Sequence, residues 1–215
     1  MQLNKLKQYN GLFLSFEGLD GSGKTTQISK TKEWLESKNW NVMVLREPGG
    51  TVFGEKLRSA ILETQEDIDP LAQAMLFASS RAQLLSKKIL PFLSNKNHCV
   101  ILDRYIDSSI AYQGYAAGLG METITQLHSY SPLNQMPDLT FYLEINLETS
   151  LSRQSSRGED KDYFEKNDTA FYQKLELGYK ECCKVFSERI KVINAIQDIE
   201  NVFKDIKQDL NDYIV

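Results

Sequence analysis

The chain has 215 residues, of which 41% are hydrophobic and 25% are charged, and it carries a net charge of -4. This length and balance are typical of one globular domain with a sizeable core, so we expect a single domain over residues 1–215. The acidic balance argues against a nucleic-acid-binding protein, because such proteins usually carry a basic patch or stripe.

The sequence shows no sign of export or membrane insertion. The first ten residues are polar and do not resemble a signal peptide, and no apolar run approaches the roughly 18 residues that span a bilayer. We therefore expect a cytoplasmic protein with no membrane and no nucleic-acid partner. Cys99, Cys182 and Cys183 fit neither a disulfide framework nor a zinc site, and we expect all three to be reduced packing residues.

Short apolar, β-rich runs alternate along the chain with segments of helical periodicity. Strands are expected at residues 12–16, 42–45, 99–102, 139–145 and 190–193. Helices are expected at 26–37, 71–92, 121–130, 164–186 and 202–213, with turns at 48–50 and 131–132. Because the strands are apolar on both faces, this βαβ rhythm predicts a central five-stranded parallel sheet in a three-layer α/β/α fold. The almost wholly polar segment 153–162 predicts a mobile surface loop.

The segment after the first strand fits the phosphate-binding pattern G-x-x-x-x-G-K-[ST] at every fixed position. It reads Gly18-Leu19-Asp20-Gly21-Ser22-Gly23-Lys24-Thr25, and a helical pattern follows from Thr26. Glycines let backbone N–H groups converge on phosphate oxygens, and the helix adds the positive end of its dipole. We therefore predict a P-loop NTPase fold that binds ATP through residues 18–26. Lys24 would contact the β and γ phosphates, and the Thr25 hydroxyl would bind Mg2+.

A buried strand that ends in a carboxylate follows at residues 99–103. In P-loop proteins such a strand is the Walker B element, whose aspartate holds magnesium directly or through water. Many buried strands also end in Asp at a turn, and this segment alone leaves that alternative open. Thr25 and Asp103 are the predicted metal ligands.

Five segments in register carry a resemblance to a known family. They are FEGLDGSGKTTQ at 16–27, REPGGT at 46–51, FASSR at 77–81, DRY at 103–105 and AYQG at 111–114. Their order resembles that of bacterial thymidylate kinases, which are P-loop nucleoside monophosphate kinases, over nearly the whole chain. The resemblance implies phosphoryl transfer from ATP to thymidine monophosphate (dTMP) with Mg2+, and it implies a homodimer.

The resemblance also implies where the base of the acceptor binds. Arg81 would reach the thymine O4, and Phe77, on the same helix face, would stack on the ring. Arginine carries only donors, so it suits a carbonyl at ring position 4 and opposes the amino group of cytosine. Ser108 and Ser109, or Gln113, would approach the edge of the base.

The sugar and the acceptor phosphate have implied partners as well. Asp20 would accept the 3′-hydroxyl, and Tyr112 would crowd a ribose 2′-hydroxyl. Arg104 and Arg58 are the candidates for gripping the phosphate, because a guanidinium matches phosphate oxygens two at a time. The turn at 47–50 would shape the acceptor side. Structural alternatives stay open, with these side chains acting as caps, turn residues, packed aromatics or exposed helix residues.

Catalysis in this account needs positive charge on the transferred phosphoryl group, because an acceptor phosphate is already ionised near neutral pH. The resemblance implies an arginine from the P-loop or from a lid. Since Gly21 fills the P-loop slot, Arg153 and Arg157 in a lid at 153–162 are candidates beside Lys24 and Arg104. The lid departs from the family pattern, with Tyr163 where a second arginine would fall and Lys161 as the alternative cation.

Other functions stay open from the sequence. A kinase of the same fold could act on a deoxynucleoside, uridylate or cytidylate, and a hydroxyl acceptor would need a base, for which Glu17 is the convenient candidate. The chain could also be a P-loop ATPase or GTPase switch, although residues 95–98 fail the last position of the guanine-reading N-K-x-D motif. A binding-only module would need an inactive lid. His98 and His128 have no visible metal or catalytic partner.

Overall fold

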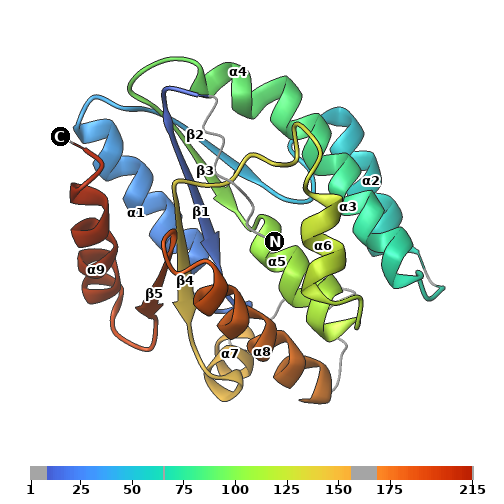
Figure 1. Ribbon diagram of the computed structural model, residues 1–215. Coiled ribbons are helices and arrows are strands. Elements are labelled where there is room, and N and C mark those ends of the chain that lie inside the picture. The colour runs from blue at the N-terminus through green and yellow to red at the C-terminus, as the bar shows by residue number, and fades with distance from the viewer. Residues whose placement is uncertain (1–8, 65, 156–168, 215) are drawn as a thin grey trace.

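The computed structural model describes residues 9–64, 66–155 and 169–214. In this part of the chain a five-stranded sheet has the order β2-β3-β1-β4-β5, with every neighbouring pair parallel (Figure 1). The strands are β1 (Leu12–Glu17), β2 (Asn41–Arg46), β3 (His98–Asp103), β4 (Leu139–Glu144) and β5 (Ile190–Asn194). The predicted strands and the parallel α/β sheet are confirmed.

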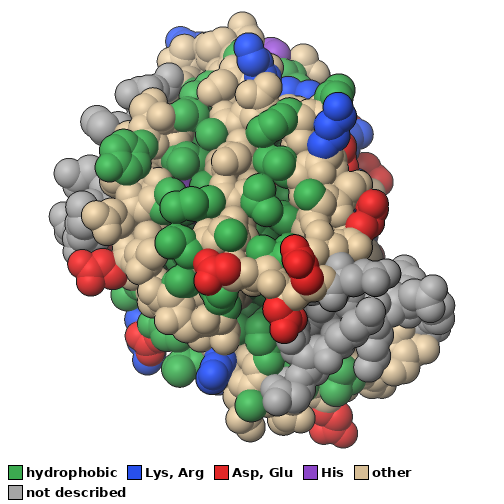
Figure 2. All heavy atoms as spheres, turned by 90° about the vertical axis from the view of Figure 1, so that its right-hand side faces the viewer, with side chains coloured by type: hydrophobic (Ala, Val, Ile, Leu, Met, Phe, Trp, Pro, Cys, Tyr) green, Lys and Arg blue, Asp and Glu red, His purple; other side chains and the backbone are tan. Residues whose placement is uncertain are grey.

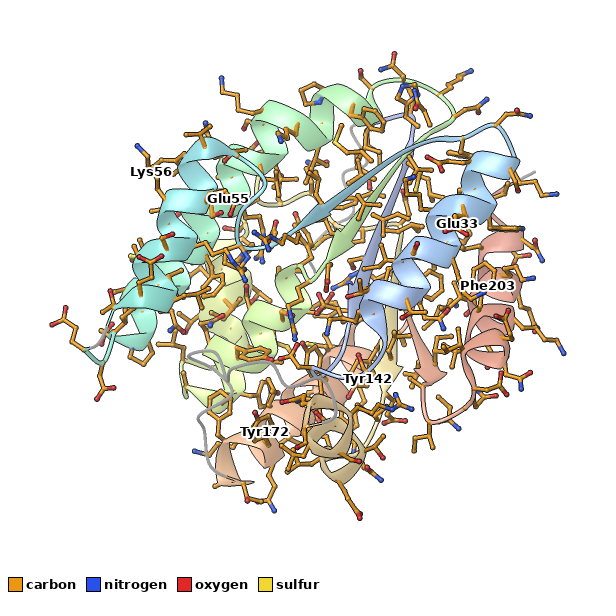
Figure 3. The ribbon with its side chains drawn as sticks, turned by 180° about the vertical axis from the view of Figure 1, so that it is seen from behind. Glu33, Glu55, Lys56, Tyr142, Tyr172 and Phe203 are labelled. Atoms are coloured by element: carbon orange, nitrogen blue, oxygen red, sulfur yellow. The ribbon has the colours of Figure 1, made fainter. Side chains whose placement is uncertain are left out.

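Helices cover both faces of the sheet. They are α1 (Lys24–Ser37), α2 (Val52–Glu63), α3 (Pro70–Leu84), α4 (Leu90–Leu93), α5 (Ile106–Ser109), α6 (Met121–Leu127), α7 (Leu147–Ser155), α8 (Thr169–Val185) and α9 (Ile199–Asn211). Helix α1 packs on β1, β2 and β3 and beside α9, whereas α4 and α8 contact β3 and β5 from the other face. Figure 3 shows Glu55 and Lys56 of α2 on one flank of the molecule and Phe203 of α9 on the other.

The ends of the buried strands bring several connecting segments together at one edge of the sheet. Every residue of β1 is buried, and its hydrophobic side chains belong to the core. Phe16 of β1 and Arg46 of β2 both pair with Asp103 of β3, so these strands end together. In parallel sheets the connections after such ends meet in one crevice, which is the usual binding position. The P-loop and the turns after β2 and β3 therefore meet.

The predicted helix 71–92 contains a π-helical segment, η1 (Leu85–Ile89), between α3 and α4. The N–H of Leu90 bonds to the carbonyl of Leu85, five residues back. Pro91 lies at the start of α4, and a proline cannot donate and crowds the carbonyl four residues before it. We attribute the wider turn to this proline. A second π-helical segment, η2 (Ile110–Ala116), continues α5 and was not predicted.

Other predicted boundaries also differ. Helix α6 ends at Leu127 rather than at 130, because His128 adopts a non-helical cap conformation. The predicted loop 153–162 begins inside α7, so its start is corrected: residues 153–155 are helical. Arg157, Lys161 and Tyr163 lie outside the described residues, as does the start of the predicted helix 164–186.

Helix α8 approaches η2 very closely at Gly178. A Cβ there would lie 2.8 Å from Ala111 Cα, so only glycine fits. This contact places the next residue, Tyr179, in the interior. Cys99 and Cys182 are buried, Cys183 is half-buried, and all three are free, as predicted. Within the described ranges, no helix has the length and apolar character needed to cross a membrane.

Candidate active site

The predicted P-loop connects β1 to α1. Gly18, Gly21 and Gly23 have φ values of 140°, 78° and 94°, a region that side-chain-bearing residues rarely adopt. A Cβ at Gly23 would meet no atom within 4 Å, so the loop leaves open space in front of the start of α1. Lys24 Nζ donates to the carbonyls of Gly18 and Leu19, both at 3.1 Å. The loop thus has the open cradle and the lysine that phosphate binding requires.

One cavity of about 470 Å3 opens beside this loop at the carboxyl edge of the sheet. All nine predicted substrate-binding residues line it, together with the three predicted contacts of the donor phosphates and metal. They are Asp20, Lys24, Thr25, Arg58, Phe77, Arg81, Asp103, Arg104, Ser108, Ser109, Tyr112 and Gln113. The structure therefore brings together residues from the P-loop, α2, α3 and the segment after β3. Glu47, Pro48 and Gln154 line the same cavity.

Arg104 has an unusual backbone and several side-chain partners. Its φ of 70° is rare for a residue other than glycine, and its N–H bonds to Phe16 O at 3.0 Å. Nη2 donates to Asp20 Oδ1 at 2.6 Å, and Nη1 donates to Tyr179 OH at 3.1 Å and Ser108 Oγ at 3.2 Å. Burial raises the pKa of Asp20, but the charges of Arg104 and Lys24 outweigh it and hold this pKa well below its usual range. Asp20 is thus an anion held between two cations.

Glu17 is fully buried behind this network. Its Oε1 accepts from the N–H of Tyr105 at 2.7 Å, and Oε2 accepts from Ser108 Oγ at 2.6 Å and Tyr179 OH at 3.4 Å. Burial, helped by the charge of Asp107, raises the pKa of Glu17 to about 7 against these hydrogen bonds. Among the described residues that line the cavity Glu17 is absent, so the geometry does not favour it as a base for a hydroxyl acceptor.

Arg81 is almost fully buried, so its alternative interpretation as an exposed helix residue is wrong. Nε donates to Glu47 Oε2 at 2.6 Å, Nη2 donates to Ser109 Oγ at 3.1 Å, and Nη1 lies 2.5 Å from His128 Nε2. The guanidinium lies over the ring of Tyr105, 4.6 Å from its centroid. These contacts hold the guanidinium of Arg81 at the wall of the cavity.

The face of α3 that carries Phe77 and Arg81 also carries Gln73. Gln113 Nε2 donates to Gln73 Oε1 at 2.9 Å, and both side chains are buried. Sequence reasoning missed Gln73, although its spacing of four residues from Phe77 was a usable signal. His128 and Tyr179 were missed as well, and nothing local in the sequence marks either of them.

The metal prediction can be tested against the donor atoms present. Asp103 Oδ1 is buried and has no hydrogen-bond partner. Thr25 lines the same cavity with its side chain exposed. Oxygen ligands of this kind suit Mg2+, so the two residues fit the predicted ion.

A second cavity, of about 610 Å3, lies on the other side of the P-loop. It is lined by residues of the P-loop and α1, by Arg153 of α7, and by the connection from β5 to α9, whose Phe203 is labelled in Figure 3. Arg153 Nη1 donates to Gly21 O at 3.2 Å, and Nη2 donates to Ala195 O at 3.1 Å. Arg153, a predicted catalytic residue, therefore lines this cavity rather than the first one.

Comparison with known proteins agrees with this geometry. A family model described as thymidylate kinase matches residues 16–206. The chain belongs to the thymidylate kinase family. A thymidylate kinase of Thermoanaerobacter sp. (strain X514) is 41% identical over 204 residues, which cover 95% of this chain and 99% of that protein. The thymidylate kinase of Mycoplasma capricolum subsp. capricolum is 43% identical over 194 residues, 89% of this chain and 91% of that protein.

A solved structure of the same family is also similar. The crystal structure of thymidylate kinase from Ehrlichia chaffeensis matches with a TM-score of 0.74 and 33% sequence identity, covering 94% of this chain and 99% of that one. The five-stranded order described above is thus that of a P-loop fold shared with thymidylate kinases.

Proposed function

We infer that this member of the thymidylate kinase family phosphorylates dTMP to dTDP with ATP as the donor. One observation carries the proposal: a single cavity joins the P-loop residues Lys24 and Thr25 to the buried Arg81 and to Phe77. A donor phosphate on the loop and an acceptor nucleotide in the rest of the cavity would face each other. Phosphoryl transfer depends mainly on such positioning and on charge stabilisation.

The acceptor would be held along the length of the cavity. Phe77 would stack on the thymine, Arg81 would donate to O4, and Gln113 or Ser109 would contact the rest of the base edge. Asp20 pairs with Arg104 through Oδ1, and its Oδ2 would accept the 3′-hydroxyl. Tyr112 lines the cavity and would crowd a ribose 2′-hydroxyl, so it would favour deoxyribose.

The triphosphate of ATP and the single phosphate of the acceptor would meet beside Arg104. Arg58, whose Nη1 bonds to Pro48 O at 3.3 Å, would join Arg104 on the acceptor phosphate. Lys24 would release its carbonyl contacts to bind the donor phosphates, with the backbone of residues 18–26 around them. Thr25 and Asp103 would hold Mg2+, which neutralises charge on the transferred group. The second cavity has room for the nucleoside of ATP beside Arg153, and Arg157 stays a predicted lid cation.

An acceptor panel tests this proposal. ADP formation is followed with Mg2+ and ATP in the presence of thymidine, dTMP, dUMP, UMP, dCMP or AMP, and without acceptor. We expect the highest kcat/KM with dTMP. Turnover only on another acceptor would contradict the base assignments, and acceptor-independent ADP release would indicate an ATPase.

We also propose that the chain is a single domain that acts in the cytoplasm as a homodimer. Large apolar side chains are exposed on neighbouring helices, with Val52 at 82%, Phe53 at 47% and Met75 at 50% exposure. Figure 2 shows hydrophobic side chains spread over the face that includes α2 and α3. An exposed apolar face of this kind supports self-association. Light scattering should give the mass of a dimer for the wild type and the mass of a monomer for Phe53→Ser. A monomeric wild type would refute the proposal.

A further inference from the structure

The side chain of His128 is buried at the end of α6, against the guanidinium of Arg81. Nε2 lies 2.5 Å from Arg81 Nη1, and Nδ1 lies 2.8 Å from the backbone carbonyl of Ile124. The imidazole therefore connects α6 to α3 across 47 positions of sequence. His128 therefore contacts Arg81, the arginine that the proposed function assigns to the edge of the base.

The two contacts decide which nitrogen carries the proton. A carbonyl oxygen only accepts, so Nδ1 must donate to Ile124 and Nε2 is left as the acceptor. Nε2 then accepts from the N–H of Arg81 Nη1. Burial and the charge of Arg81 lower the pKa of His128 to about 3, against the effect of the Ile124 carbonyl. The ring is thus a neutral acceptor at any ordinary working pH.

The donors of Arg81 can be assigned one by one. An arginine has five N–H groups in a rigid fork. Nε uses its proton on Glu47, Nη1 uses one on His128 and Nη2 uses one on Ser109. One N–H on each Nη has no partner among the described residues, and the side chain lines the cavity. These two are the donors that can meet a ligand.

The three anchors do different work. Glu47 accepts only from Nε and Tyr105 packs on the face of the guanidinium, so neither of them bonds to the two terminal nitrogens. The hydroxyl of Ser109 can rotate to follow its donor. His128 cannot, because its ring is fixed at Nδ1 by Ile124 and is only 1% exposed. The direction of the remaining Nη1 N–H is therefore set chiefly by His128.

We propose that His128 is a positioning residue for base selection, which fixes the Arg81 guanidinium so that its remaining donors meet a carbonyl oxygen on the pyrimidine edge. The inference rests on the proposed role of Arg81. A fixed donor discriminates between a carbonyl and an amino group at ring position 4, whereas a swinging guanidinium can turn away from the amino group. His128 would then affect selectivity and acceptor KM without touching the substrate.

Two kinds of substitution distinguish the effect of the acceptor atom Nε2 from the effect of the size of the His128 ring. His128→Phe keeps a ring but has no acceptor, and His128→Met is a flexible second variant without a strong acceptor. His128→Gln returns an oxygen near the position of Nε2. His98→Gln is the matched control, because His98 begins β3 at the end opposite Asp103, about 17 Å away by strand geometry. Kinetic constants are measured for dTMP, dCMP and ATP, with thermal unfolding as a check on folding.

We expect His128→Phe and His128→Met to raise KM for dTMP and to lower the dTMP-to-dCMP ratio of kcat/KM by about 10- to 100-fold, the range for a hydrogen bond to a charged group. KM for ATP should stay within about twofold, as for an independent site. His128→Gln should recover most of the selectivity, and His98→Gln should lose none.

Arg81→Met distinguishes the failure of this inference from failure of the proposed function. If Arg81→Met lowers selectivity but folded His128→Phe and His128→Met leave it unchanged, the positioning role is overturned and the role of Arg81 stands. If Arg81→Met itself leaves selectivity unchanged, the proposed base contact fails and the inference falls with it. The double variant should show no loss beyond Arg81→Met, because the two side chains act as one unit. Additive losses would contradict the coupling.

Discussion

Arg104 donates from Nη2 to Asp20 Oδ1 at 2.6 Å, and this contact joins the end of β3 to the P-loop. The same guanidinium reaches Tyr179 of α8 at 3.1 Å through Nη1. One side chain therefore connects the donor loop, the Walker B strand and the helix that follows the predicted lid. These contacts would place the Arg104 guanidinium between the donor and the acceptor in the proposed reaction.

Arg104→Lys tests that position. A lysine is a point charge that cannot hold Asp20 and Tyr179 with a planar fork, so we expect kcat/KM for dTMP to fall by about 10- to 100-fold. The loss should include kcat, because the charge is close to the transferred group. Steady-state kinetics check this, and an activity equal to that of the wild type would show that Arg104 acts only as a structural contact.

Glu17→Gln tests the buried carboxyl through the pH dependence of stability. The pKa of Glu17 is about 7 in the folded protein, above the ordinary value of 4.5, so the folded state binds the proton more tightly. The contribution of this group to the free energy of unfolding is therefore present at low pH and is lost as pH rises from about 4.5 to about 7, by on the order of 1–3 kcal/mol. Glutamine has no proton to lose. Denaturant unfolding at several pH values should show a steeper decline in the wild type than in the variant, and parallel curves would contradict the raised pKa.

Gly21→Ala tests the packing of α7 on the P-loop. Gly21 has a φ of 78°, and an added Cβ would lie 3.0 Å from Ser150 O and 3.2 Å from Arg153 Cβ. We expect α7 to be displaced and KM for ATP to rise several-fold. Gly118→Ala is the matched control, since Gly118 has a φ of 85° and open space around it. An effect of Gly21→Ala on KM for ATP no larger than that of Gly118→Ala would contradict the role of this packing contact.

Gln73→Leu tests whether Gln73 orients Gln113. Without the acceptor Oε1 of Gln73, the buried Nε2 of Gln113 loses its partner and the amide can turn. We expect KM for dTMP to rise about 3- to 10-fold, the scale of a neutral hydrogen bond, with KM for ATP unchanged. Gln126→Leu, on the exposed side of α6, is the control. The orienting role would be refuted if Gln73→Leu behaved like that control.

The strands and the P-loop were predictable because their signals are local. The apolar runs at β1, β3 and β4 require burial on both faces, and the parallel arrangement then brings Glu17, Arg46 and Asp103 to one edge. The spacing of Phe77 and Arg81 likewise fixes them on one face of α3. The positions of these residues follow from their spacing in the sequence and from the geometry of a single strand or helix.

The partners behind the cavity were not predictable, because tertiary packing alone brings them there. Tyr179 meets Glu17 across 162 positions, and this contact depends on the glycine that lets α8 approach η2. His128 meets Arg81 from the position directly after α6, which ends at Leu127. The π-helical segment η1 is attributed to Pro91, and η2 was not predicted. Arg157 and Tyr163 lie outside the described residues, so their predicted roles stay predictions.

The proposed binding of dTMP can be checked by a crystal structure of the complex with dTMP, Mg2+ and a non-hydrolysable ATP analogue. We predict that the thymine lies in the cavity of about 470 Å3, stacked on Phe77, with O4 at a hydrogen-bond distance of about 3 Å from a terminal nitrogen of Arg81. The triphosphate would follow residues 18–26. A thymine bound elsewhere, or one with its O4 facing away from Arg81, would contradict it.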